Sequence, residues 1–244
     1  MYKMSDLIIV KFGSRALTGE DNSLDNLESN IQRFSKNLAK YSDRLVVVAS
    51  GAVFCGKLLA PEIKDPAVLA TIGNPALARI WQQSFSEFSV TSSQVLVTHR
   101  ELGIDTERAR LLSVLNNSLN LGVVPIINEN DALSDEELKK LIYGGDNDGL
   151  AAEIAKLLGA KHLVLYTDAD GFMVDGRIQS KLSLDKLDEL SPHAGKSDRG
   201  GGMVTKLKAA RDFASHRAES KSYVAHAGEP LELVLESKAG TTIG

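Results

Sequence analysis

The 244-residue chain has little sulfur and no long apolar run. Cys55 is the only cysteine, so no internal disulfide can form, which fits a reducing compartment. No uncharged stretch approaches the roughly 20 apolar residues that a membrane-spanning helix needs. No apolar run of signal-peptide length precedes Lys11. We therefore expect a cytoplasmic protein with no membrane partner.

The chain also lacks a strong excess of either charge. It carries 28 basic and 32 acidic residues, for a formal net charge of −4. No basic stripe with interleaved aromatic residues is present, which argues against a nucleic-acid partner. The composition is 43% hydrophobic and 25% charged, as in ordinary globular proteins. No Pro- or Ser-rich linker or repeat divides the sequence, so we expect a single domain over residues 1–244.

Short β-branched runs alternate with helical patterns along the chain. Five buried strands and a possible last one are predicted at residues 7–10, 45–48, 95–97, 123–127, 163–166 and 222–225. Helices are predicted at residues 24–38, 67–85, 108–119, 149–158 and 203–216, the second interrupted at Gly73-Asn74-Pro75. This alternation predicts an α/β fold with a mostly parallel sheet and helices on both faces.

Two polar clusters stand where apolar runs end and helices begin, at Asn128-Glu129-Asn130-Asp131 and Gly145-Asp146-Asn147-Asp148. Their carboxylates could be metal ligands, acid–base groups or binders of an ammonium group, or they could be solvated helix caps. In open α/β sheets, ligands bind beyond the carboxyl ends of the strands, where both clusters are expected. We therefore favour a binding site.

Glycines and lysines stand at three further corners. Lys11-Phe12-Gly13-Ser14 and Ser50-Gly51-Ala52 follow predicted strands, and each taken alone is an ordinary turn. Residues 200–206 bring three glycines and Lys206 to a helix entrance, which suits a phosphate. Thr167-Asp168 follows another strand, where it could hold a nucleotide or form a tight turn with Gly171 at positive φ.

Two lysines from distant segments, glycine turns and carboxylates together indicate phosphoryl transfer. That reaction needs positioning and charge stabilisation more than a covalent helper. A mixed pocket of carboxylates and amides would suit an acceptor that carries both an ammonium and a carboxylate group. No histidine or cysteine spacing typical of a metal site occurs.

At these residues the chain resembles the amino acid kinase family, and within it the glutamate kinases. The resemblance covers nearly the whole chain. Its markers are Val10-Lys11-Phe12-Gly13-Ser14, Ser50-Gly51-Ala52, Ile127-Asn128-Glu129-Asn130-Asp131, Gly145-Asp146-Asn147-Asp148, Thr167-Asp168 and Gly201-Gly202-Met203-Val204-Thr205-Lys206. The resemblance implies a three-layer sandwich with a central, mainly parallel sheet between helical layers. It also implies ATP-dependent phosphorylation of the side-chain carboxylate of L-glutamate to L-glutamyl 5-phosphate, at the start of proline synthesis.

The resemblance assigns roles to individual residues. Lys11 and Lys206 would stabilise the transferring phosphoryl group, and Asp148 would orient both. The implied glutamate-binding residues are Ser50, Gly51, Asp131 and Asn147. The implied nucleotide-binding residues are Lys11, Gly13, Thr167, Asp168, Gly200, Gly201, Gly202, Met203, Val204, Thr205 and Lys206. Mg²⁺ would bridge the ATP phosphates with no dedicated protein cage, and homo-oligomers (dimers or tetramers) are expected.

The chain departs from the family pattern in three places. Many members carry a further C-terminal domain, whereas this sequence ends near the end of the kinase domain. Asp65-Pro66-Ala67-Val68 stands where members usually have a Lys-Gln-Ala-like segment. The segment at residues 171–177 is shorter than the corresponding segment of other members. Two alternatives stay open: an acetylglutamate, aspartate, carbamate or uridylate kinase, and a non-catalytic regulator that binds amino acids or nucleotides.

Overall fold

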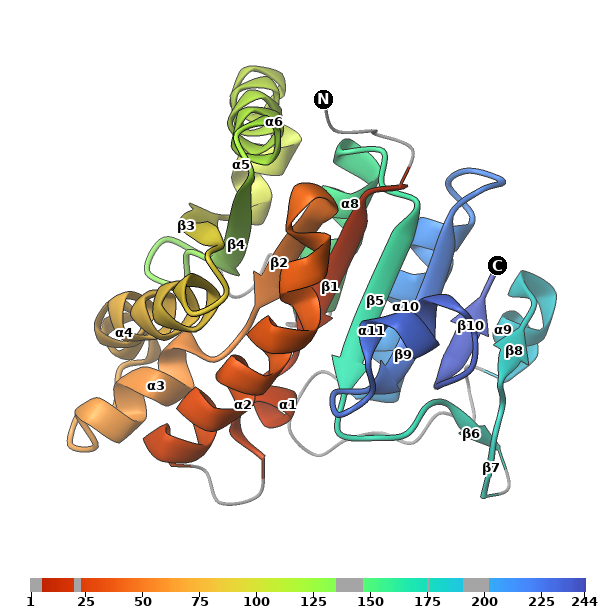
Figure 1. The fold of residues 1–244 in the computed structure, drawn as a ribbon, viewed down its shortest axis with the longest axis horizontal. Coiled ribbons are helices and arrows are strands. Elements are labelled where there is room, and N and C mark those ends of the chain that lie inside the picture. Colours follow the sequence, from red (N-terminus) through yellow and green to blue (C-terminus); the bar gives the residue numbers. More distant parts are fainter. Residues whose placement is uncertain (1–5, 20–22, 135–146, 175, 191–201) are drawn as a thin grey trace. The chain divides into compact units, whose positions relative to one another are not determined.

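The computed structural model describes residues 6–19, 23–134, 147–174, 176–190 and 202–244 (Figure 1). Its larger sheet has eight strands in the hydrogen-bonded order β3, β4, β2, β1, β5, β9, β10, β8. The bounds of these strands are β1 Ile8–Phe12, β2 Leu45–Ala49, β3 Thr91–Val97, β4 Val123–Glu129, β5 His162–Thr167, β8 Lys181–Leu182, β9 Lys221–His226 and β10 Thr241–Ile243.

Among the pairings that the structure describes in this sheet, only that of β9 with β10 is antiparallel. Helices flank the strands, so the predicted sandwich with a central, mainly parallel sheet is confirmed. A separate two-stranded ribbon pairs β6 (Met173–Val174) with β7 (Arg177–Ile178). No helix within the described ranges is long and apolar enough to cross a membrane.

The chain divides into two compact units. Unit 1 comprises residues 12–135 with 1–2, and unit 2 comprises residues 3–11 with 136–244. The helices of unit 1 are α1 Ser14–Thr18, α2 Leu24–Leu38, the 3-10 helix η2 Ala39–Arg44, α3 Ala52–Leu59, α4 Pro66–Ser86, α5 His99–Gly103 and α6 Asp105–Asn120. The helices of unit 2 are α8 Asn147–Leu157, α9 Leu184–Leu190, α10 Met203–Ala214 and α11 Leu231–Leu235.

Within unit 1, β2, β4 and β3 run parallel, with Val47 and Gln94 both in register with Ile126. All five residues of β2 are buried, as expected for a strand covered on both faces. Helix α2 has the predicted bounds, and its cap Ser23 accepts a hydrogen bond from the Asn26 amide at 3.2 Å. Strand β3 begins at Thr91, four residues before the predicted start, because its serines and glutamine hide the apolar signal.

The predicted interruption at Gly73-Asn74-Pro75 is wrong, because α4 runs without a break through Pro75. The helix buries a long apolar face, including Leu77 and Trp81, and this burial outweighs the cost of one lost backbone hydrogen bond. The glycine serves packing instead. A Cβ on Gly73 would lie 1.8 Å from the Ala52 carbonyl oxygen, so the α3 and α4 backbones touch directly there.

Within unit 2, β9 pairs in parallel with β5 and antiparallel with β10, which in turn pairs in parallel with β8. Helices α8 and α10 pack on each other behind these strands, and α11 lies in front of β9 (Figure 1). Strand β1 extends to Phe12, so Lys11 lies inside the strand rather than after it. Strand β9 is not the last strand, because β10 follows it.

Candidate active site

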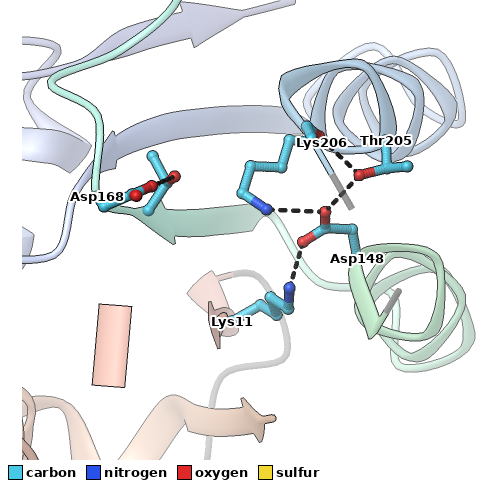
Figure 2. A network of polar contacts seen from close by, with 7 residues as sticks. Lys11, Asp148, Asp168, Thr205 and Lys206 are labelled. Atoms are coloured by element: carbon cyan, nitrogen blue, oxygen red, sulfur yellow. Dashed lines mark hydrogen bonds and ion pairs between the residues drawn. The ribbon is translucent and has the colours of Figure 1, made fainter. Parts of the chain in front are cut away.

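A buried cluster in unit 2 brings two lysines onto one carboxylate (Figure 2). Lys11 Nζ lies 2.7 Å from Asp148 Oδ1, and Lys206 Nζ lies 3.1 Å from Asp148 Oδ2. The three side chains are 0%, 8% and 1% exposed for Lys11, Lys206 and Asp148 respectively. The structure therefore unites the three residues predicted to be catalytic, although they stand far apart in the sequence.

Each member of the cluster is held by a regular element. Lys11 belongs to β1, all of whose residues are buried. Asp148 lies in the first turn of α8, and Lys206 lies in the first turn of α10. An aspartate in the first turn of a helix is stabilised by the free N–H groups and the macrodipole there. The fold thus fixes the backbone of every charged group in the cluster.

Thr205 joins the cluster beside Lys206. Its Oγ1 lies 3.1 Å from Asp148 Oδ2 and 2.8 Å from the Gly202 carbonyl oxygen, so one hydroxyl proton serves two acceptors. Gly202 is the N-cap of α10 and has an extended backbone. The sequence predicted a nucleotide contact for Thr205 but gave no sign of its link to Asp148.

The charge of this cluster suits an incoming anion. Two ammonium groups face one carboxylate in this buried place. Burying unbalanced charge is costly, and hydrogen bonds or a counter-charge must offset it. A phosphoryl group would provide that counter-charge. During transfer its negative charge is spread over its three equatorial oxygens, which the two ammonium groups could stabilise.

Thr167 is the last residue of β5, also in unit 2, and Asp168 follows it. Thr167 Oγ1 donates to Asp168 Oδ1 at 3.0 Å, and the Asp168 side chain is exposed (Figure 2). The turn alternative is partly seen, since Gly171 has a φ of 153° and a Cβ there would meet Thr241 Oγ1 at 2.9 Å. The nucleotide contact of Thr167 and Asp168 stays a prediction.

Two of the residues predicted to bind glutamate follow β2 in unit 1. The Ser50 amide donates to the Phe12 carbonyl at 3.1 Å, which ties this turn to the end of β1. Gly51 has a φ of 111°, a conformation that side chains disfavour, and α3 begins at the next residue, Ala52. The corner is therefore a strand-to-helix turn, as the sequence indicated.

The first polar cluster spans the end of β4, also in unit 1, with Asn128 and Glu129 as the last two residues of the strand. Asn128 is 4% exposed, and its Nδ2 donates to Asn74 Oδ1 of α4 at 2.9 Å. Buried Glu129 accepts a hydrogen bond from Ser134 Oγ at 2.6 Å. Asp131 is partly exposed in the turn that follows. Sequence reasoning missed Asn74 because its place between a glycine and a proline indicated a helix break.

The remaining predicted site residues divide by whether the structure describes them. Asn147 is 7% exposed at the start of α8, and Met203 and Val204 lie in the first turn of α10. Gly13 is the N-cap of α1. Four predicted members of the glycine and acidic motifs, Gly145, Asp146, Gly200 and Gly201, lie outside the described residues. Within the described ranges, no group of three or more His, Cys, Asp or Glu side chains is placed to hold a metal ion.

Cys55 is buried on α3, where it could serve packing or act as a nucleophile. Burial raises the pKa of its thiol, and the nearby charge of Glu28 raises it further. A thiol with a raised pKa is mostly protonated near neutral pH and therefore a poor nucleophile. The environment supports the packing role.

The chain matches a known protein family over most of its length. The amino acid kinase family matches residues 6–226. The chain belongs to the amino acid kinase family. Among curated members, a glutamate 5-kinase of Clostridium perfringens (strain 13 / Type A) is 32% identical over 99% of this chain and 95% of its own length. A glutamate 5-kinase of Thermoanaerobacter sp. (strain X514) is 38% identical over 84% of this chain.

Relatives differ in length. The chain spans 58–63% of the length of three of the curated glutamate 5-kinases that it matches. Among solved structures, Giardia carbamate kinase superposes with a TM-score of 0.73 at 13% identity, covering 99% of both chains. An N-acetylglutamate synthase from Neisseria gonorrhoeae gives a TM-score of 0.64 at 18% identity. These two likenesses show the amino acid kinase fold.

Proposed function

We propose that the protein transfers the γ-phosphoryl group of ATP to the side-chain carboxylate of L-glutamate, which gives L-glutamyl 5-phosphate and ADP. The buried Lys11–Asp148–Lys206 cluster is the observation that carries this proposal. The similarity to curated glutamate 5-kinases supports glutamate as the acceptor. The product is an acyl phosphate, which is activated for reduction at the same carbon. Proline synthesis begins with this activation.

In the proposed reaction, a side-chain carboxylate oxygen of glutamate attacks the γ-phosphorus. The bond to the oxygen that bridges the β- and γ-phosphorus breaks, and ADP leaves with that electron pair. Lys11 and Lys206 stabilise the charge that builds on the migrating group, because fixed charges in a dry site need no reorganisation. Asp148 keeps both ammonium groups in place between turnovers.

The other predicted residues complete the proposal. Ser50, Gly51, Asp131 and Asn147 hold glutamate, with the Asp131 carboxylate suited to its ammonium group. The residues proposed to hold the nucleotide are Gly13, Thr167, Asp168 and the segment 200–206. Mg²⁺ would neutralise phosphate charge, held by the phosphate oxygens and water, as is common for this ion. The described residues fit that arrangement, since both Asp148 oxygens already face lysines.

Three broader proposals accompany this function. The two units act together as one amino acid kinase domain over residues 1–244. The protein works in the cytoplasm, and it assembles as a dimer or tetramer. Light scattering of the purified protein tests the assembly, because a monomeric mass would contradict it.

The test of the function is product identification. Purified protein is given ATP, Mg²⁺ and hydroxylamine with L-glutamate, N-acetylglutamate, aspartate or carbamate as acceptor. We expect ADP release that depends on glutamate, with an equal amount of glutamyl hydroxamate. Hydroxamate from N-acetylglutamate but not from glutamate would show a different kinase of the family. Folded protein that is inactive with every acceptor would indicate a regulator instead.

A further inference from the structure

Two consecutive residues in the middle of α4 contact the chain beside two of the segments proposed to hold the acceptor. A Cβ on Gly73 would meet the Ala52 carbonyl oxygen at 1.8 Å, so α4 lies directly against the first turn of α3. That turn comes straight after Ser50 and Gly51. All of these residues belong to unit 1. The position of α4 therefore limits where the corner after β2 can lie.

The next residue reaches the other segment. Asn74 is 5% exposed, and its Oδ1 accepts a hydrogen bond from Asn128 Nδ2 at 2.9 Å. Asn128 Oδ1 in turn accepts one from the Glu129 amide at 2.9 Å. Both the nitrogen and the oxygen of the Asn128 side-chain amide are therefore hydrogen-bonded. A buried amide that loses one partner must find another or bear the full cost of desolvation.

The chain that follows Asn128 forms a turn around Asp131. The Asn130 amide donates to the Val97 carbonyl of β3 at 2.8 Å, and the Leu133 amide donates to the Asn130 carbonyl at 2.9 Å. These bonds hold the two ends of the turn, and Asn128 lies next to the last residue of β4, just before the turn. Asp131 comes three residues after Asn128, so the conformation of Asn128 at the end of β4 limits where the Asp131 carboxylate can lie.

We propose that Gly73 and Asn74 form a positioning element for the acceptor site. Gly73 acts through the first turn of α3 on Ser50 and Gly51, and Asn74 acts through Asn128 on Asp131. Neither residue contacts the substrate in this scheme. The inference rests on the proposed function, since it assigns the element to the glutamate pocket rather than to the ATP pocket.

A buried amide pair could also serve stability alone, so the test separates the two roles. Asn74→Ala removes the acceptor for Asn128 in the residue type most favourable to helices. Asn74→Asp keeps an oxygen of the same shape at Oδ1. The matched control is Gln94→Met, because Gln94 Nε2 donates to the Asn74 backbone carbonyl at 3.3 Å rather than to the Asn74 side chain. Steady-state kinetics, a thermal melt and glutamate-induced stabilisation are measured for each variant.

Positioning predicts that Asn74→Ala raises the KM for glutamate about tenfold, as expected for one lost buried hydrogen bond, and leaves the KM for ATP within about twofold. It also predicts that Asn74→Asp restores most of the glutamate affinity and that Gln94→Met leaves both KM values unchanged. If Asn74→Ala does not fold, Asn74→Ser takes its place with the same expectation.

Two results overturn the inference. One is a variant that melts earlier but keeps the wild-type KM for glutamate, which shows a stability role alone. The other is an equal rise in the KM for ATP and for glutamate, which shows a general distortion. Wild-type protein with no glutamate-dependent hydroxamate would refute the proposed function, and the inference would fall with it.

Discussion

The substitution Asp148→Asn probes the charge balance of the buried cluster. In the wild type the Asp148 carboxylate lies between two ammonium groups, and the amide variant removes that negative charge. Asparagine has nearly the same shape as aspartate, so packing is preserved while the counter-charge is lost. Both lysines are then left buried without the carboxylate that lies 2.7 and 3.1 Å from their ammonium nitrogens.

Removing one partner of a buried ion pair typically costs about 3–5 kcal/mol of unfolding free energy. With a urea m-value of about 2–3 kcal/mol/M, this lowers the unfolding midpoint by about 1–2.5 M. Turnover should fall at least about 100-fold, because the two lysines lose the group that holds them. Urea denaturation followed by circular dichroism and the hydroxamate assay measure the two effects.

A matched control lies on the same helix as Lys206. Asp212 of α10 pairs with Lys156 at 2.6 Å, but its side chain is 53% exposed. Asp212→Asn removes the same charge at the surface, where an ion pair contributes about 0–1 kcal/mol. An Asp148→Asn protein with the urea midpoint of the Asp212→Asn protein would refute the reasoning, since the carboxylate would then not compensate the lysines.

Four further outcomes are expected. Lys206→Ala should lower kcat at least about 100-fold with a smaller change in the KM for ATP, because the lysine acts mainly in the transition state; near-normal turnover would contradict this. Asp131→Ala should raise the KM for glutamate about tenfold or more without changing the KM for ATP, as measured by steady-state kinetics. Gly73→Ala should lower the free energy of unfolding by more than about 3 kcal/mol, because its Cβ would overlap a backbone oxygen. Gly103 has open space around it, so the unfolding free energy of Gly103→Ala should be within about 1 kcal/mol of wild type in urea denaturation. Burial raises the pKa of Tyr223 from 10.0 to about 12. The neutral phenol therefore contributes to folding stability below pH 10, and this contribution is lost as pH rises from 10 to about 12. Thermal melts between about pH 9 and pH 12 should show the loss, and Tyr223→Phe should make it smaller.

The sequence predicted the strands and helices with the strongest apolar signals. Strands β2, β4 and β5 are continuous buried runs, and each was located to within two residues. The short elements β6, β7, β8 and β10 were missed, because two or three residues carry no periodicity. Their pairing is set by long-range contacts, such as that of Thr242 with Lys181.

The break expected in α4 is absent, because tertiary packing outweighs the local preference of glycine and proline against helix interiors. Glycine and proline disfavour a helix interior, yet Gly73 is needed for the contact with α3. The apolar face on either side supplies the free energy to continue the helix. A sequence gives the local cost of such residues but not the partner that they contact.

The sequence predicted which residues form the charged cluster, but it did not predict how their side chains are arranged. The family motifs indicated Lys11, Asp148 and Lys206, and the structure places all three in one buried cluster. That one carboxylate oxygen faces each lysine, and that Thr205 shares one of these oxygens, could not be read from spacing. Asn74 carried no motif, because its role depends on a neighbour 54 residues away in the chain.

The most direct test of the central claim follows an oxygen atom. L-Glutamate labelled with ¹⁸O in its side-chain carboxylate is incubated with the protein, ATP, Mg²⁺ and hydroxylamine, and the released phosphate is analysed by mass spectrometry. If the carboxylate attacks phosphorus, hydroxylamine then breaks the acyl bond and the phosphate keeps one ¹⁸O atom. Unlabelled phosphate, or equal labelling from glutamate marked in its α-carboxylate, would contradict the account.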